Sequence, residues 1–225
     1  MKRPDTRRPR RARNTRASRS PKVRAPKRRL SHDAEQALTP RQLEILDALE
    51  LWVLRRDFAD VTMAEIARTM GCSLRTLYGI APGKDELILA VLDRRLHRIG
   101  REAIAALEPE DPPLTRLRAY LHATNLAVQP TTAAFARDYG RVPGARALNE
   151  SHANYIVAIT RELLDEAVRE GEIEAVETAA VAHVLGRLGN EFARPDMVDA
   201  TGGSPGEKAD SLAEILLRGL AARSR

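Results

Sequence analysis

Residues 73–78 read Ser-Leu-Arg-Thr-Leu-Tyr and hold the side chains best suited to recognition chemistry. The guanidinium fork of Arg75 matches the O6 and N7 atoms of guanine, and Thr76 can touch a thymine methyl group or a phosphate. Tyr78 and Lys84 suit phosphate oxygens, as do the backbone amides at a helix start. The candidate nucleic-acid contacts are therefore Thr62, Ser73, Leu74, Arg75, Thr76, Tyr78 and Lys84.

The other reactive residue types form no catalytic pattern. The five histidines show no metal-ligand spacing with one another or with the single cysteine, Cys72. The sequence contains no nucleophile elbow, phosphate-binding glycine loop or dinucleotide fingerprint. We therefore expect no catalytic residue, no cofactor and no metal, with an enzyme kept as an alternative. A lone cysteine is more typical of a small buried hydrophobe than of a redox sensor.

Three short helices and a long one are expected to position residues 73–78. Thr39-Pro40-Arg41-Gln42 and Thr62-Met63-Ala64-Glu65 each have the capping-box signature. Gly71 can end the second helix and Ser73 can cap the third. A helix, a glycine turn and a capped second helix are the plan of a helix-turn-helix, although an ordinary helical hairpin fits the same pattern. The apolar spacing predicts helices over 40–56, 63–70, 74–78 and 84–106.

The rest of the chain also predicts helices. Apolar residues recur with helical periodicity, and no stretch shows the two-residue alternation of a strand. Ser204-Pro205-Gly206-Glu207 is a third capping-box sequence, and Thr201-Gly202-Gly203 before it predicts a flexible linker. The protein is therefore expected to be all-α, with further helices over 114–128, 131–139, 146–170, 177–193 and 205–223.

A basic tail precedes these helices. Residues 1–30 contain fourteen Lys or Arg residues and one acid, so they carry +13, whereas the whole chain carries +6 and its remainder is mildly acidic at −7. Four prolines and no aromatic residue predict a disordered tail over residues 1–37. The tail either strengthens nucleic-acid binding through its charge or is a solvated leader, such as a start codon placed too far upstream would add.

The motifs around the helix-turn-helix form one ordered set: Ile45-Leu46-Asp47-Ala48, Thr62-Met63-Ala64-Glu65-Ile66-Ala67, Gly71-Cys72-Ser73, Thr76-Leu77-Tyr78, Lys84 and Leu87. In order and spacing, this set resembles the N-terminal domain of the TetR (tetracycline-repressor) family over roughly residues 38–90. That family usually has an aromatic pair after the tyrosine, whereas this chain has Gly79-Ile80-Ala81, which should loosen the end of the third helix.

The resemblance implies a function and a division of the chain. It implies a three-helix DNA-binding domain over 38–98 and a helical effector-binding and dimerisation domain over 99–225. The implied protein is a ligand-responsive regulator, a repressor or alternatively an activator, that acts as a homodimer on a palindromic operator. Its implied partners are double-stranded DNA, a second copy of itself and an unknown small-molecule effector.

The body offers candidates for the implied effector pocket. Four of the eight aromatic residues fall in one region, His152 shares a helical stripe with apolar neighbours, and Asn125 lies near Leu121 and Val128. A few polar groups on apolar walls are typical of a small-molecule pocket, although an ordinary core fits the same pattern. The candidate residues are Tyr120, Asn125, Phe135, Tyr139, His152 and Tyr155.

Two apolar helical faces near the C-terminus are candidates for the implied dimer interface. Ala182, Gly186 and Gly189 lie among the large residues of the first face, and such small residues let helices approach closely. We expect both faces to form a four-helix bundle with a second chain, unless the monomer uses them in its own core. The candidate residues are Val181, Val184, Leu185, Leu188, Phe192, Leu212, Ile215, Leu216 and Leu220.

The composition fits a cytoplasmic protein. No apolar run approaches the ~20 residues of a membrane helix, and the N-terminus lacks the apolar core of a secretory signal, so we expect no membrane partner. A helical adaptor with a basic RNA-binding tail is the remaining alternative. Removing residues 1–30 would abolish all nucleic-acid binding by such an adaptor, whereas a helix-turn-helix protein would keep its sequence preference.

Overall fold

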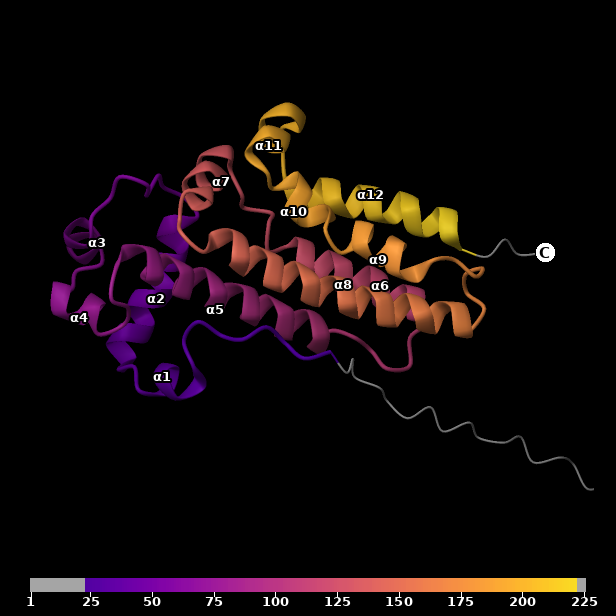
Figure 1. Cartoon of the computed structure of the whole chain (residues 1–225), viewed down its shortest axis with the longest axis horizontal. Coiled ribbons are helices and arrows are strands. Elements are labelled where there is room, and N and C mark those ends of the chain that lie inside the picture. Colours follow the sequence, from indigo (N-terminus) through magenta and orange to yellow (C-terminus); the bar gives the residue numbers. More distant parts are fainter. Residues whose placement is uncertain (1–22, 222–225) are drawn as a thin grey trace, which may run out of the picture.

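The computed structural model describes residues 23–221, which form an all-helical protein (Figure 1). Within these residues the one strand-like contact is an isolated antiparallel bridge between Ile173 and Ala221. The predicted all-α class is thus confirmed. The helices are α1 (His32–Gln36), α2 (Pro40–Val53), α3 (Met63–Thr69), α4 (Leu74–Tyr78), α5 (Lys84–Ala105), α6 (Pro113–Asn125), α7 (Ala133–Gly140), α8 (Ala145–Arg169), α9 (Thr178–Leu185), α10 (Leu188–Phe192), α11 (Pro195–Thr201) and α12 (Pro205–Leu220).

The helix starts follow the capping signals of the sequence. The Gln42 amide donates to the Thr39 hydroxyl (3.2 Å), and the Thr39 amide donates to the Gln42 side chain (2.9 Å). Thr62 and Glu65 form the same reciprocal pair at the start of α3. At α12 only half of the box forms: Ser204 accepts from the Glu207 amide. Helix α4 has the predicted bounds, because its cap and its glycine turn were both visible in the sequence.

Two hydrophobic cores organise the described residues. The first joins α2, α3, α4 and the first half of α5, and it includes Phe135, Tyr139 and Leu148 from α7 and α8. The second packs α6, α8, α9 and α12 around fully buried side chains such as Leu117 and Leu164. Apolar burial is the main stabilising contribution to a fold. Because side chains of α7 and α8 are part of the first core, the packing unit around the helix-turn-helix extends well beyond residue 98.

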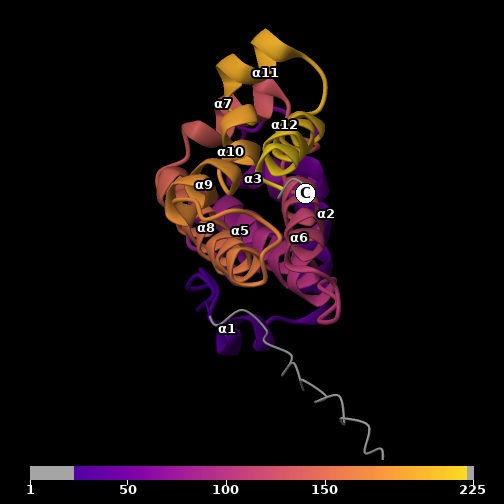
Figure 2. The ribbon, with the colours of Figure 1, turned by 90° about the vertical axis from the view of Figure 1, so that its right-hand side faces the viewer.

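Helix α5 runs from the helix-turn-helix into the body, where α8 lies beside it (Figure 1). In the view turned by a quarter, α8 and α9 form one flank and α6 forms the other, while α7 and α11 lie on the side away from α1 (Figure 2). Within residues 23–221, no helix combines the length and the apolar character that crossing a bilayer requires.

The structure differs from the expected helices near the C-terminus. The helix expected over 177–193 is broken after Leu185, at Gly186, where α9 packs so closely that a Cβ would lie 3.0 Å from the Val157 Cα of α8. Helix α11 forms where the sequence predicted no helix. Pro195 fills its first position, and Gly202 follows its end with a φ of +60°.

The segment before α2 also differs from expectation. The sequence placed residues 23–37 in a disordered tail, yet they include α1, which Ser31 caps by accepting from the Ala34 amide (3.1 Å). The Arg29 amide donates to the Asp93 carboxylate (2.8 Å), and Leu30 packs against the first core. This segment is therefore held against α5. Residues 1–22, the rest of the predicted tail, lie outside the described residues.

Candidate functional site

A tight turn and a buried anchor fix the direction of α4. Gly71 adopts a left-handed conformation (φ +58°) after α3, which glycine tolerates best. Ser73 then caps α4 by accepting from the Thr76 amide (3.1 Å). The Leu77 side chain is fully buried in the first core. The helix-turn-helix predicted from the sequence is thus present, with its second helix anchored on one side only.

The other side of α4 faces solvent and carries three of the predicted contact residues. Leu74 is 41% exposed, Tyr78 is 54% exposed, and Arg75 between them is exposed as well. A basic side chain flanked by exposed apolar and aromatic ones suits base edges and the sugar-phosphate wall of a DNA groove. The hydroxyl groups of Thr62 and Ser73 accept hydrogen bonds within their own helix caps. At these two positions, the groups suited to a phosphate are therefore the backbone amides at the helix start.

Helix α2 buttresses α4 through one side chain. Gln42 Nε2 donates to the Thr76 carbonyl (3.3 Å). A Cβ at position 79 would lie 2.8 Å from this same nitrogen, so Gly79 provides the space for the contact. The departure from the family pattern at Gly79 therefore coincides with a close approach of α2 to the end of α4, a feature that the sequence alone did not suggest.

Lys84 contacts the loop before α3, a contact that the sequence did not indicate. Its ammonium group donates to the carbonyls of Ala59 and Phe58 (3.4 Å for Phe58) in the loop before α3. From the other side, Asp138 of α7 accepts from the amides of Phe58 (2.7 Å) and Ala59 (3.0 Å). Lys84 therefore has a positioning contact with the loop before α3, and the phosphate contact predicted for it stays a prediction.

A buried ion-pair cluster fastens α2 to α5. Glu50 is 5% exposed, and its carboxylate accepts from Arg95 (3.0 Å) and Arg98 (2.7 Å). Burial opposes its ionisation, but the two guanidinium groups outweigh burial and hold the pKa of Glu50 below its ordinary value of 4.5. Arg95 also donates to the Ala127 carbonyl (3.2 Å), so the cluster reaches the segment after α6.

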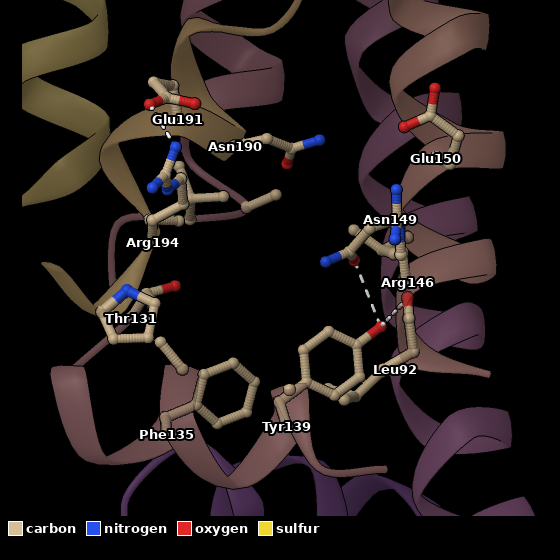
Figure 3. A pocket seen from close by; sticks show the side chains of 18 of the residues that line it. Leu92, Thr131, Phe135, Tyr139, Arg146, Asn149, Glu150, Asn190, Glu191 and Arg194 are labelled. Atoms are coloured by element: carbon tan, nitrogen blue, oxygen red, sulfur yellow. Dashed lines mark hydrogen bonds and ion pairs between the residues drawn. The ribbon is translucent and has the colours of Figure 1, made fainter. Parts of the chain in front are cut away.

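The body contains a cavity of about 720 Å³ between α5, α7, α8 and α10 (Figure 3). One wall is apolar: the Phe135 and Tyr139 rings stack with centroids 5.7 Å apart, close to Leu92. The Tyr139 hydroxyl donates to the Asn149 side chain (3.2 Å). The volume lies within the roughly 300–1,000 Å³ range of small-molecule sites.

The rest of the cavity lining is polar, and sequence reasoning missed it. Arg146 and Glu150 lie one turn apart on α8, a spacing that also fits any solvated helix face, so no sequence signal marked them. The opposite polar residues come from α10 and from the short segment between α10 and α11. These are Asn190, Glu191 and Arg194.

The six predicted pocket residues separate into three pairs. Phe135 and Tyr139 line the large cavity, while Asn125 and His152 line a smaller neighbouring one. Tyr120 is fully buried in the second core and Tyr155 packs half-buried against it. These two pack in the second core and line neither of the two cavities, so their role in a pocket stays a prediction.

The predicted dimer residues divide between the core and the surface. Leu185 and Leu188 are 2% and 7% exposed within a single chain, so they are corrected to core residues; the break at Gly186 lets both pack inward. Val184 and Ile215 are 52% and 66% exposed, an unusual exposure for large apolar side chains. The others pack half-buried against the second core: Val181, Phe192, Leu212, Leu216 and Leu220.

The fold and the exposed α4 are similar to those of solved TetR-family structures. A TetR transcription regulator from Haloarcula marismortui matches with a TM-score of 0.67 and 18% identity, over 81% of this chain and 98% of that one. PfmR, a TetR family transcriptional regulator from Thermus thermophilus, matches with a TM-score of 0.57 and 22% identity, over 80% of this chain and 99% of that one. The chain therefore has the fold of the TetR-family regulators, and the resemblance predicted from its sequence is confirmed.

The curated proteins that the chain resembles are helix-turn-helix transcriptional regulators. The HTH-type transcriptional regulator BetI of Brucella canis is 34% identical over 98 residues, which are 44% of this chain and 47% of that protein. The chain thus spans about half the length of this relative. BetI of Brucella melitensis is 28% identical over 161 residues, or 65% of this chain and 81% of that protein. No family model matches the sequence.

Proposed function

We propose that this chain is a sequence-specific DNA-binding regulator of transcription that acts as a homodimeric, ligand-responsive repressor on a palindromic operator. The observation that carries the proposal is the exposed face of α4, with Arg75 between Leu74 and Tyr78, on a helix anchored by a buried leucine. A two-fold dimer would present two such helices to successive major grooves, and a palindromic site would match that symmetry.

Selection of bound duplexes from a random oligonucleotide pool tests this proposal. Arg75→Ala should cost about 1–3 kcal/mol in operator binding and relax the preference at one base position in each half-site, if Arg75 forms a bidentate contact with guanine. Arg161→Ala is the matched control, because it removes an exposed arginine from α8, far along the chain from α4. An unaltered base preference in Arg75→Ala would assign Arg75 to a phosphate.

The large cavity supports the ligand-responsive part of the proposal. Its apolar wall and polar lining suit a small amphipathic molecule. Leu54 at the end of α2 and Leu92 of α5 both line it, so a bound molecule would touch the DNA-binding unit directly. A second connection runs through α7, which carries Phe135 and Tyr139 in the cavity wall and Asp138 at the loop before α3.

A ligand acts on DNA binding only if it prefers one arrangement of these helices. Coupling of about 1–3 kcal/mol would change operator affinity roughly 5- to 150-fold. Compounds that raise the melting temperature of the chain should therefore be screened for their effect on operator affinity. If none of the stabilising compounds alters it, the ligand-responsive part of the proposal is wrong while the DNA-binding part stands.

Exposed apolar side chains support the dimer. Val184 of α9 and Ile215 of α12 leave apolar surface in water that a second chain could cover. A two-fold interface uses the same patch on both subunits, and four helices in a bundle would bury these side chains together. Sedimentation of the full chain measures this directly.

A further inference from the structure

Three ionisable side chains that the proposed function does not use meet inside the protein. Asp93 and His97 lie one turn apart on α5, and His152 reaches them from α8. Their exposed fractions are 3%, 8% and 7%. One nitrogen or oxygen atom from each residue lies within 4.8 Å of the other two. Ionisable groups are seldom buried together without a partner or a bound ion.

The interatomic distances suit a metal ion. His152 Nε2 lies 3.1 Å from Asp93 Oδ1, and His97 Nε2 lies 3.5 Å from the same oxygen. In a tetrahedral site with bonds of about 2.0–2.1 Å, neighbouring ligand atoms lie about 3.3–3.4 Å apart. The two histidine rings meet edge to face with centroids 4.9 Å apart. A small rotation of either ring would therefore shorten the distance between the two histidine nitrogens.

An unpartnered nitrogen provides an independent observation. His97 Nε2 is buried and has no hydrogen-bond partner within residues 23–221, although the Asp93 carboxylate lies nearby. A buried polar atom without a partner is unfavourable in a folded protein. An ion between His97 and Asp93 would give this nitrogen a partner without any change of the helices.

A hydrogen bond from outside the cluster orients the Asp93 carboxylate. Asp93 Oδ2 is occupied by the Arg29 amide, which orients Oδ1 toward the histidines, as the outer partners of metal ligands commonly do.

We propose that Asp93, His97 and His152 bind one divalent transition-metal ion of the Zn²⁺ class, with water as the fourth ligand. Two imidazoles and one carboxylate suit zinc and its neighbours, whereas Mg²⁺ and Ca²⁺ favour oxygen ligands throughout. His152 binds through Nε2 in the tautomer that is protonated at Nδ1. The nearby positive charges of Arg28 and Arg101 oppose a cation, so the affinity lies below that of a four-ligand structural site.

Calorimetric titration of the full chain with zinc chloride and with cobalt chloride tests this site without any DNA. In calorimetry we expect one Zn²⁺ or Co²⁺ ion per chain and no binding of Mg²⁺. We also expect the Co²⁺-loaded protein to show the visible absorption of four-coordinate Co²⁺, and the metal to raise the melting temperature. His97→Ala and His152→Ala should each weaken binding by more than the roughly 10- to 100-fold that loss of an outer partner causes. His122→Ala is the matched control, because that histidine also lies beside an aspartate, Asp210, but is exposed.

Absence of Zn²⁺ and Co²⁺ binding by the wild-type chain would overturn the proposal and leave the cluster as an internal hydrogen-bonded contact. Binding that survives in His97→Ala and His152→Ala but is lost in Cys72→Ser or His122→Ala would also overturn it, since the ion would then lie elsewhere. Circular dichroism checks that each variant folds. If His97→Ala does not fold, His97→Gln and the Co²⁺ spectrum of His152→Ala decide the question.

Discussion

Replacing Glu50 by glutamine should loosen the junction between α2 and α5. The change keeps the size of the side chain but removes the negative charge that two guanidinium groups share. Breaking a buried ion pair costs about 3–5 kcal/mol. The Arg98 side chain is 38% exposed and can regain water, whereas that of Arg95 is 14% exposed, which places the expected loss near the lower end, at about 3 kcal/mol.

Thermal unfolding followed by circular dichroism measures this loss. For a chain of this size, about 1 kcal/mol shifts the melting temperature by roughly 2–4 °C, so Glu50→Gln should melt roughly 6–12 °C below the wild type. Glu44→Gln is the matched control, because Glu44 pairs with Arg41 in the open, with both side chains more than half exposed. Exposed pairs contribute only about 0–1 kcal/mol. Equal melting temperatures for the two variants would refute the assignment.

The pH dependence gives a second measurement on the same pair of proteins. The pKa of Glu50 is lower in the folded chain than its ordinary value of 4.5, so its charge stabilises the folded state above that value. As the pH falls below about 4.5 and through the folded pKa, the carboxylate is protonated and this contribution is lost. The stability difference between wild type and Glu50→Gln should therefore be largest near neutral pH and shrink in acid. A difference that grows in acid would contradict this sign.

Three further predictions follow from the site and the surface. Ile215→Glu charges an exposed apolar position, so it should give folded monomers by sedimentation and weak operator binding. Leu188→Glu charges a core position, so it should destabilise the fold by about 3 kcal/mol or more. A stable dimer in Ile215→Glu would place the interface elsewhere. Deleting residues 1–22, which include ten Lys or Arg residues, should lower non-specific affinity and flatten the salt dependence while the selected DNA sequence stays the same; an unchanged salt slope would show that the tail does not touch DNA. Asp138→Asn should weaken operator binding with little change in helical content, because the loop before α3 loses a charged acceptor; wild-type affinity in this variant would separate that loop from DNA recognition.

Local signals predicted the helix-turn-helix end of the chain well. Thr39, Thr62 and Ser73 are capping residues whose partners lie three positions away, so a linear sequence displays them fully. Gly71 likewise marked its turn, because a left-handed residue is a local requirement. Residues whose roles depend on their immediate neighbours were therefore placed correctly.

Contacts between distant segments could not be predicted in the same way. Leu188 fits an apolar helical face whichever side that face turns to, and only the break at Gly186 decides that it points inward. The approach of His152 to Asp93 and His97 depends on the packing of α8 on α5, so the spacing of Asp93 and His97 was the one part of this cluster visible in the sequence. Lys84 was assigned by its charge, but the loop carbonyls that it binds lie in another element.

The shared first core has a consequence for protein engineering. Chimaeric regulators are made by joining the DNA-binding part of one protein to the sensing part of another, and the end of α5 would be the natural junction. In this chain such a junction would separate Phe58 from the ring of Phe135, whose centroid lies 6.0 Å away, and the loop at Phe58 from the Asp138 carboxylate. A transplant that folds well should therefore carry residues 133–148 with the N-terminal helices, or should be redesigned wherever the incoming body meets that surface.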